Sequence, residues 1–207
     1  MTARWPADPS HIAQAAEQLR AGAVIAFPTD TLYAVGARAE DPVAVARLYE
    51  VKHRPSAQPM VWLVLDRAQV ERFAVVSDAA VELMARFWPG PLTLVLPARM
   101  KTNGPTIAVR APYHQVALAL LRSLDEPIAS SSANRAGAPP PVDADQVIAD
   151  LRDRVDIVLD GGPCRIGQPS TILDLSGPTP RILRQGVIPA SELVSPSPAG
   201  GESGGGG

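Results

Sequence analysis

Apolar positions along the chain switch between helical spacing and short continuous runs, a pattern typical of an α/β protein. The first helix is predicted over residues 11–21, with Ser10 as its cap and Gly22 after its end. A second helix over residues 43–51 follows Asp41-Pro42, a favourable cap and first-turn pair. Further helices are predicted over residues 67–74, 78–87, 114–123 and 144–153, the last capped by Asp143.

Short apolar runs between these helices predict strands, which alternate with helices first and crowd together later. We therefore expect a single α/β domain with a twisted, mixed sheet flanked by helices over residues 1–194. The Gly-, Ser- and Pro-rich stretch 195–207 is expected to be a flexible tail. The predicted strands cover residues 23–27, 60–65, 92–96, 106–110, 127–131, 155–160, 170–175 and 181–184.

Composition narrows the possible functions. The chain of 207 residues has a formal net charge of −2 and only 4% aromatic residues, which argues against a dedicated nucleic-acid binder. Cys164 is the single cysteine and the three histidines are dispersed, so neither an intrachain disulfide nor a metal site is expected. No signal peptide or membrane-spanning run is evident, and we expect a cytoplasmic protein with no membrane partner.

Five polar clusters fall where predicted strands or helices end. "FPTDTLYAVG" (27–36) follows a strand, and its hydroxyls and carboxylate suit either a ligand or an ordinary turn. In "KHRP" (52–55), a lysine in an arginine-rich chain stands beside Arg54; the pair suits a polyphosphate or the negative end of a helix dipole. "SSSANRAG" (130–137) is a strand ending in a turn or a set of ligand groups.

The remaining clusters are also open to two interpretations. Arg110, at the end of "TIAVR", projects either into a cleft or onto a structural carboxylate. "DGGPCRIGQPSTILDL" (160–175) contains either two tight turns or a phosphate cradle, although its spacing fits no standard phosphate-binding motif. Cys164 has no neighbouring base in the sequence, so no covalent nucleophile is assigned. Together the clusters favour binding and orientation of an anionic, nucleotide-like substrate.

The order of the motifs is more specific than any one of them. The series "PTDT-x-Y", "K-x-RP", "WPGPLT", "AVRAP", "SSAN-x-xG", "DGG", "G-x-x-STI" and "LR-x-G" resembles the YrdC-like family of threonylcarbamoyl-AMP synthases. The resemblance covers about residues 10–190 and matches the short, single-domain form. It implies a twisted, mixed α/β sheet around a deep cationic cleft.

The resemblance also implies an activity. L-threonine, bicarbonate or CO2, and ATP would give threonylcarbamoyl-AMP and pyrophosphate, with Mg2+ accompanying ATP. A partner transferase would then modify the tRNA adenosine beside the anticodon, and a weak tRNA contact of this chain is conceivable. Such a nucleotidyltransferase needs no protein nucleophile, because the carbamate of threonine attacks the α-phosphorus.

Roles carry over to the matching positions in two groups. Lys52 and Arg54 are expected to position the ATP phosphates. The ATP group comprises Lys52, Arg54, Thr106, Ser132, Asn134 and Arg184, and the threonine group comprises Thr29, Thr31, Arg110, Ser130 and Ser170.

Two positions depart from the family pattern. Ala34 replaces the usual glycine after the tyrosine, as in an uncharacterised side branch of the family, and Pro140 stands where a serine often contacts ATP. Two other functions remain open: an RNA-binding module of the same fold, and a related carbamoyl-transfer enzyme that uses carbamoyl phosphate.

Overall fold

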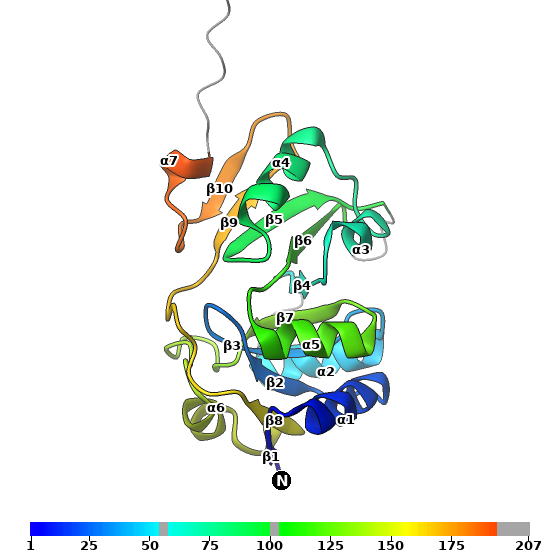
Figure 1. The fold of residues 1–207 in the computed structure, drawn as a ribbon, viewed down its shortest axis with the longest axis vertical. Coiled ribbons are helices and arrows are strands. Elements are labelled where there is room, and N and C mark those ends of the chain that lie inside the picture. Colours follow the sequence, from blue (N-terminus) through cyan, green and yellow to red (C-terminus); the bar gives the residue numbers. More distant parts are fainter. Residues whose placement is uncertain (54–57, 100–103, 194–207) are drawn as a thin grey trace, which may run out of the picture.

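A single mixed sheet organises the computed structural model, which describes residues 1–53, 58–99 and 104–193. Among these residues ten strands are hydrogen-bonded in the order β1-β8-β2-β3-β7-β4-β6-β5-β9-β10, and they stack from bottom to top in Figure 1. Four of the neighbouring pairs are parallel and five antiparallel, so the predicted mixed α/β sheet is confirmed. The predicted tail 195–207 lies outside the described residues. The strands are β1 (Ala3–Pro6), β2 (Ile25–Pro28), β3 (Tyr33–Arg38), β4 (Val61–Leu63), β5 (Leu92–Pro97), β6 (Thr106–Arg110), β7 (Ile128–Ser132), β8 (Ile157–Asp160), β9 (Thr171–Asp174) and β10 (Arg181–Arg184).

Two strands were not predicted. β3 overlaps the stretch 27–36, which is interpreted from the sequence only as a ligand site or an ordinary turn, and four residues separate it from β2. Its residues Tyr33–Ala37 are all buried, and such a strand shows no polar alternation in its sequence. β1 is a short edge strand ending in Pro6, paired in parallel with β8. Because β1 has only four residues and ends in a proline, the apolar pattern does not predict it.

Aspartate caps set the starts of several helices. The prediction that Ser10 caps the first helix is wrong: the Asp8 carboxylate accepts the N–H groups of Ser10 and His11, and the helix begins at Pro9. The predicted caps Asp41 and Asp143 are confirmed. The predicted helix 67–74 ends early, at Glu71. The helices are α1 (Pro9–Arg20), α2 (Pro42–Lys52), α3 (Arg67–Glu71), α4 (Asp78–Phe87), α5 (Gln115–Leu124), α6 (Ala144–Leu151), the 3-10 turn η2 (Arg152–Arg154) and α7 (Ala190–Leu193).

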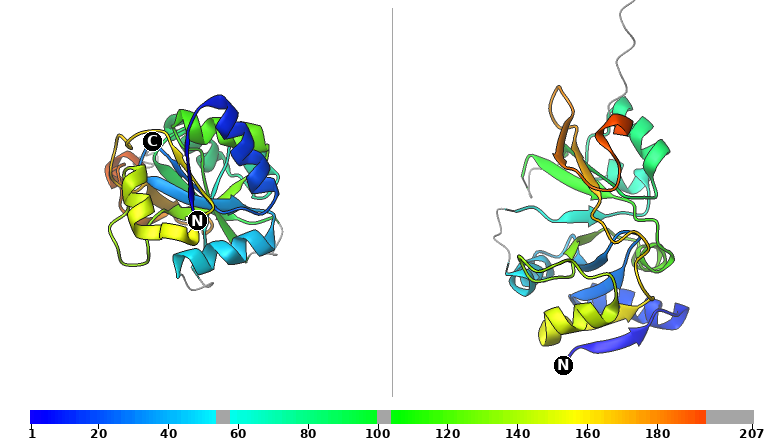
Figure 2. Two further views of the ribbon diagram at one scale, coloured as in Figure 1. Left: turned by 90° about the horizontal axis from the view of Figure 1, so that it is seen from below. Right: turned by 90° about the vertical axis from the view of Figure 1, so that its left-hand side faces the viewer.

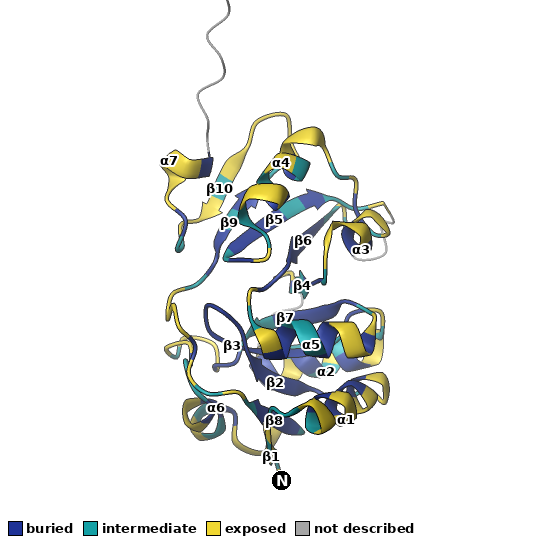
Figure 3. Ribbon diagram, in the orientation of Figure 1, coloured by how far each residue is buried: buried dark blue, intermediate teal, exposed yellow. Residues whose placement is uncertain are grey.

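Side chains alternate between the two faces of the sheet and build a separate core on each. Ile25 and Phe27 of β2 pack with α1 and α5, whereas Val24 and Ala26 pack with α2 and α6. The right-hand view of Figure 2 shows these two helix pairs on opposite sides of the lower strands. A third cluster joins α3 and α4 to β5 and β6. Figure 3 shows the buried strands between helices whose outer surfaces are exposed.

No helix among the described residues is both long and apolar enough to cross a membrane. This finding agrees with the hydropathy pattern, in which apolar runs are short and interrupted by turns.

Gly36 is a point of close approach between β3 and β7. A Cβ atom at this position would lie 2.5 Å from Cγ2 of Ile128 and 2.9 Å from the carbonyl oxygen of Ala129. Both neighbours belong to the central strand β7, so the strands would have to separate.

We predict that Gly36→Ala lowers the free energy of unfolding by about 1–3 kcal/mol, the scale of overpacking in a core. Gly177→Ala is the matched control, because a Cβ there meets nothing within 4 Å. Urea denaturation of both variants measures the difference. Equal stability of the two variants would contradict the tight β3–β7 contact.

Candidate functional site

Arg110, the last residue of β6, is fixed by protein acceptors and buried, with 6% of its surface exposed. Its Nε donates to the carbonyl of Gly90 (2.9 Å), Nη1 to Oγ1 of Thr31 (2.9 Å) and Nη2 to Oδ1 of Asp30 (2.5 Å). A guanidinium has five N–H groups, so two remain for a ligand. The pairing of Arg110 with a structural carboxylate is therefore confirmed, and its projection into a cleft stays a prediction.

Charge around Arg110 is positive on balance. Burial lowers the pKa of Arg110, the neighbouring Asp30 opposes that effect, and Arg184 lowers the pKa further by repulsion. Arginine stays charged despite such shifts. Two guanidinium groups thus lie near one carboxylate, and this surplus favours an anionic ligand group.

Ser170 connects Arg184 to the adjacent strand β5. Its hydroxyl lies 2.9 Å from Oγ1 of Thr93, and Nη2 of Arg184 donates to the same hydroxyl at 3.1 Å and to the Ser170 carbonyl at 3.0 Å. Thr93 is fully buried and was not recognised from the sequence, where it is only one polar residue inside an apolar strand. The expected threonine-group residue Ser170 and ATP-group residue Arg184 are therefore direct neighbours.

Thr29 holds the turn between β2 and β3. Its Oγ1 donates to the carbonyl of Leu32 (2.6 Å) and accepts the backbone N–H groups of Thr31 and Leu32, both at 3.2 Å. Its hydroxyl also lies 3.0 Å from Oγ1 of Thr31. Thr29 thereby orients Thr31, which in turn contacts the Arg110 guanidinium.

A second polar cluster surrounds Lys52, the last residue of α2. The buried ammonium donates to the backbone carbonyls of Ser132 and Asn134 and, at 3.3 Å, to Oδ1 of Asn134. Oγ of Ser132 donates to the same Oδ1 at 2.5 Å. Lys52 thus joins the end of α2 to the end of β7, and these three expected ATP-group residues lie together.

The loop after β7 is shaped by Asn134 and Gly137. Nδ2 of Asn134 donates to the carbonyls of Arg135 (3.0 Å) and Ala138 (2.6 Å), and Gly137 has a φ of +85° that side chains rarely adopt. Ser130 belongs to neither cluster, because its hydroxyl donates to the carbonyl of Val61 at 3.1 Å.

Register places most of these residues on one face of the sheet. Ser130 of β7 lies opposite Val61 of β4, which lies opposite Ala108 of β6, so Ser132 and Arg110 share that face. The two departures from the family pattern differ: Ala34 is buried opposite Ser132, whereas Pro140 is exposed. Arg54 lies outside the described residues.

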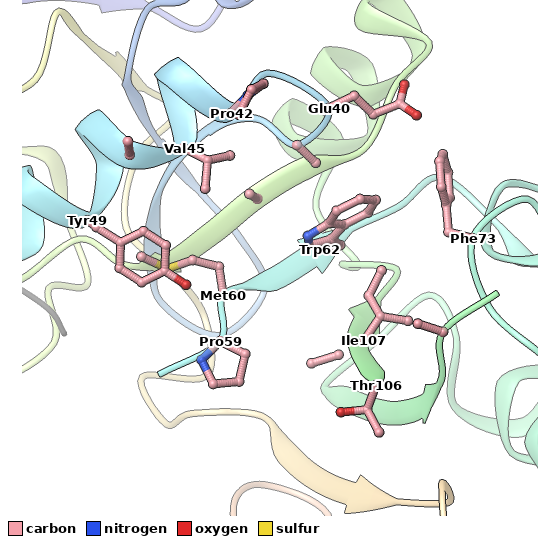
Figure 4. Close-up of a pocket in the computed structure, with 15 residues that line it drawn as sticks. Glu40, Pro42, Val45, Tyr49, Pro59, Met60, Trp62, Phe73, Thr106 and Ile107 are labelled. Atoms are coloured by element: carbon pink, nitrogen blue, oxygen red, sulfur yellow. The ribbon is translucent and has the colours of Figure 1, made fainter. Parts of the chain in front are cut away.

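A sizeable groove lies away from both polar clusters. A groove of about 750 Å3 runs beside α2, and its wall is largely apolar and aromatic, with Tyr49, Trp62 and Phe73 around it (Figure 4). Trp62 projects from the face of β4 opposite to Val61, hence opposite to Arg110. Among the described residues that line the groove, Glu40 is the only charged one. Thr106, expected near ATP, lies at its rim rather than in either polar cluster.

The described residues contain no group of three His, Cys, Asp or Glu side chains that could hold a metal ion. Burial also raises the pKa of the Cys164 thiol to about 11 and lowers the pKa of His114. The thiol is therefore neutral near pH 7, whereas a nucleophilic cysteine has to be a thiolate.

Comparisons with known proteins agree with the fold and the motifs. The Sua5, YciO and YrdC family model, described as "Telomere recombination", matches residues 17–186. Threonylcarbamoyl-AMP synthase of Bacillus subtilis is 43% identical over 190 residues, which is 88% of this chain and 55% of that protein. A putative threonylcarbamoyl-AMP synthase of Mycobacterium tuberculosis is 41% identical over 190 residues, which is 88% of this chain and 87% of that protein.

Solved structures extend this similarity to three dimensions. Pyrococcus abyssi Sua5 complexed with L-threonine superposes with a TM-score of 0.87 and 40% identity, over 93% of this chain and 59% of that one. The chain belongs to the Sua5/YciO/YrdC family. It spans just over half the length of the Bacillus and Pyrococcus relatives.

We predict that Cys164 in the folded protein reacts slowly with iodoacetamide at pH 8. A thiol with a pKa of about 11 is thiolate in roughly one molecule per thousand at that pH. Mass spectrometry should show labelling of the native chain far slower than labelling in urea. Similar rates in the two states would indicate an activated, accessible thiolate.

Proposed function

We propose that this chain forms threonylcarbamoyl-AMP and pyrophosphate from L-threonine, bicarbonate or CO2, and ATP. The observation that carries the proposal is the Arg110 guanidinium, held by three protein acceptors with two N–H groups left beside a second arginine. That arrangement suits an amino-acid carboxylate. It lies in a family member whose Pyrococcus relative was crystallised with L-threonine.

The reaction needs positioning rather than covalent catalysis. The uncharged amine of threonine adds to CO2 and gives a carbamate with release of one proton. A carbamate oxygen then forms a bond to the α-phosphorus of ATP, and the bond from that phosphorus to the β-phosphate bridging oxygen breaks, releasing pyrophosphate. The protein holds the two reactants in line and offers positive charge to the phosphates.

The two polar clusters divide these tasks. The Arg110 cluster with Ser170 receives threonine, and the end of β7 with Ser132 and Asn134 receives the nucleotide. Lys52 orients that strand end through two backbone carbonyls, so its part in ATP binding is partly indirect. Arg54 is assigned to the phosphates by its position in the K-x-R motif.

Mg2+ would enter with ATP. The described side chains offer no three-residue metal site, whereas Mg2+ commonly takes its ligands from substrate phosphates and water. When bound with ATP, the ion would neutralise part of the phosphate charge.

The product requires an acceptor enzyme. Threonylcarbamoyl-AMP is a reactive mixed anhydride, and in our proposal a transferase passes its acyl group to the tRNA adenosine beside the anticodon. An RNA-binding module is the alternative. The net charge of −2 and the scarcity of aromatic residues give it less support than the enzyme.

We predict that pyrophosphate release from ATP requires both L-threonine and bicarbonate. A coupled pyrophosphate assay with each component omitted in turn tests this requirement. Release that does not depend on threonine would refute the substrate assignment. Strongly salt-dependent tRNA binding without ATP turnover would favour the RNA-binding module instead.

We also predict that Arg54→Ala weakens ATP binding by about 1.5–3 kcal/mol, the scale of one hydrogen bond to a charged group. Arg122→Ala is the control, since Arg122 is an exposed residue of α5. Isothermal titration with ATP and Mg2+ measures both variants. Wild-type affinity in Arg54→Ala would remove this residue from the phosphate site.

A further inference from the structure

Asp30 has one carboxylate oxygen without a partner. Oδ1 accepts hydrogen bonds from Nη2 of Arg110 at 2.5 Å and from the backbone N–H of Tyr113 at 3.0 Å. Oδ2 is buried, and no donor among the described residues bonds to it. Among the described residues, Nε of Arg38 is the only other buried side-chain atom in this condition, and it has the Glu126 carboxylate 3.7 Å away. Oδ2 of Asp30 is therefore the unsatisfied buried acceptor among the described side chains.

An ionised oxygen buried without a donor is costly, typically by a few kcal/mol. Within the described residues the nearby donors bond elsewhere: the Thr31 hydroxyl lies against that of Thr29, and Nη2 of Arg110 donates to Oδ1 of Asp30 rather than to Oδ2. The residue itself is only 5% exposed, so bulk water does not solvate it well. An N–H group or a cation that entered the cluster would satisfy this oxygen.

We propose that Asp30 binds the α-ammonium group of the amino-acid substrate while Arg110 binds its carboxylate. The inference rests on the proposed function and adds a specificity residue to it. Asp30 and Arg110 are adjacent, as are the two charges of a zwitterion, which one carbon atom separates. Each substrate charge would meet an opposite charge, and a carboxylate without an ammonium group would leave Oδ2 unsatisfied.

The role belongs to recognition, not to the chemical step. Threonine arrives as a zwitterion, and its nitrogen must lose a proton before it reacts with CO2. The Asp30 contact thus selects α-amino acids over other hydroxy acids at the binding stage. Loss of the contact should raise the threonine dissociation constant.

The test pairs a variant with an altered ligand. Isothermal titration compares L-threonine with 2,3-dihydroxybutanoate, the analogue that has a hydroxyl in place of the amino group, on wild type and Asp30→Asn. We expect Asp30→Asn to raise the dissociation constant of L-threonine about tenfold, because a charge-assisted contact is lost. The analogue should bind as in wild type or more tightly, because the variant removes a negative charge.

Asp156→Asn is the matched control. Asp156 is a half-buried carboxylate paired with both terminal nitrogens of Arg47, away from this cluster. It should lower stability without changing either affinity. Equal weakening of both ligands by Asp30→Asn would mean that Asp30 acts only by positioning Arg110, and unchanged threonine affinity would place the ammonium elsewhere; either result overturns the proposal.

Wild-type protein gives an independent measurement if Asp30→Asn does not fold. Between pH 7 and pH 10 the ammonium of threonine loses its proton, so threonine binding should fall while binding of the analogue does not. His114, whose pKa is lowered from 6.5, and Cys164, with a pKa of about 11, are the nearby groups that titrate outside this range. The two arginines of the cluster stay charged. Parallel pH profiles for the two ligands would overturn the proposal.

Failure of the two proposals can be told apart. Wild type that binds threonine in this selective way but releases no pyrophosphate would refute the synthase activity and leave the Asp30 contact standing. Wild type that turns over, with Asp30→Asn affecting both ligands alike, would refute the Asp30 contact alone.

Discussion

The buried ion pair between Asp30 and Arg110 is the interaction on which the candidate site depends. It joins the turn after β2 to the end of β6, two segments that lie four strands apart in the sheet. Both side chains are at most 7% exposed, so each charge would be expensive to bury without the other. The pair therefore fixes the relative position of the two segments. The N–H groups of Arg110 and the Asp30 oxygen that the pair does not use are the groups that a ligand could contact.

Much of the fold follows from local sequence rules. The Asp41-Pro42 and Asp143 caps and most strands lie where apolar periodicity and capping predict them. β3 could not be found in this way because both of its faces are covered, and its pairing with β7 depends on a segment almost one hundred residues away. β1 depends on β8 in the same manner. Long-range pairing, not propensity, determines these two elements.

The candidate site also combines features that the sequence predicts with features that only the packing determines. Ordered motifs predict Arg110, Ser170 and Asn134 as ligand residues, but the sequence does not show that the Lys52 ammonium donates to backbone carbonyls. Nor does it show that Thr93 supports Ser170 from a neighbouring strand. A motif names the residue types that chemistry needs, whereas packing decides which of their atoms are already occupied. Thr29 is an example, because its hydroxyl is fully engaged in the turn that presents Thr31.

The groove beside α2 contrasts with the two polar clusters. Its aromatic wall lies on the sheet face away from Arg110, where Trp62 and Ala129 point, and its lining within the described part of the chain has Glu40 as the one charged residue. A ligand with several negative charges needs donors and cations more than it needs apolar volume. The polar strand ends around Arg110 and Ser132 meet that need with little open space, because their donors are already oriented by other protein groups. We therefore base the candidate site on the oriented hydrogen-bonding groups at the strand ends and not on the volume of the groove.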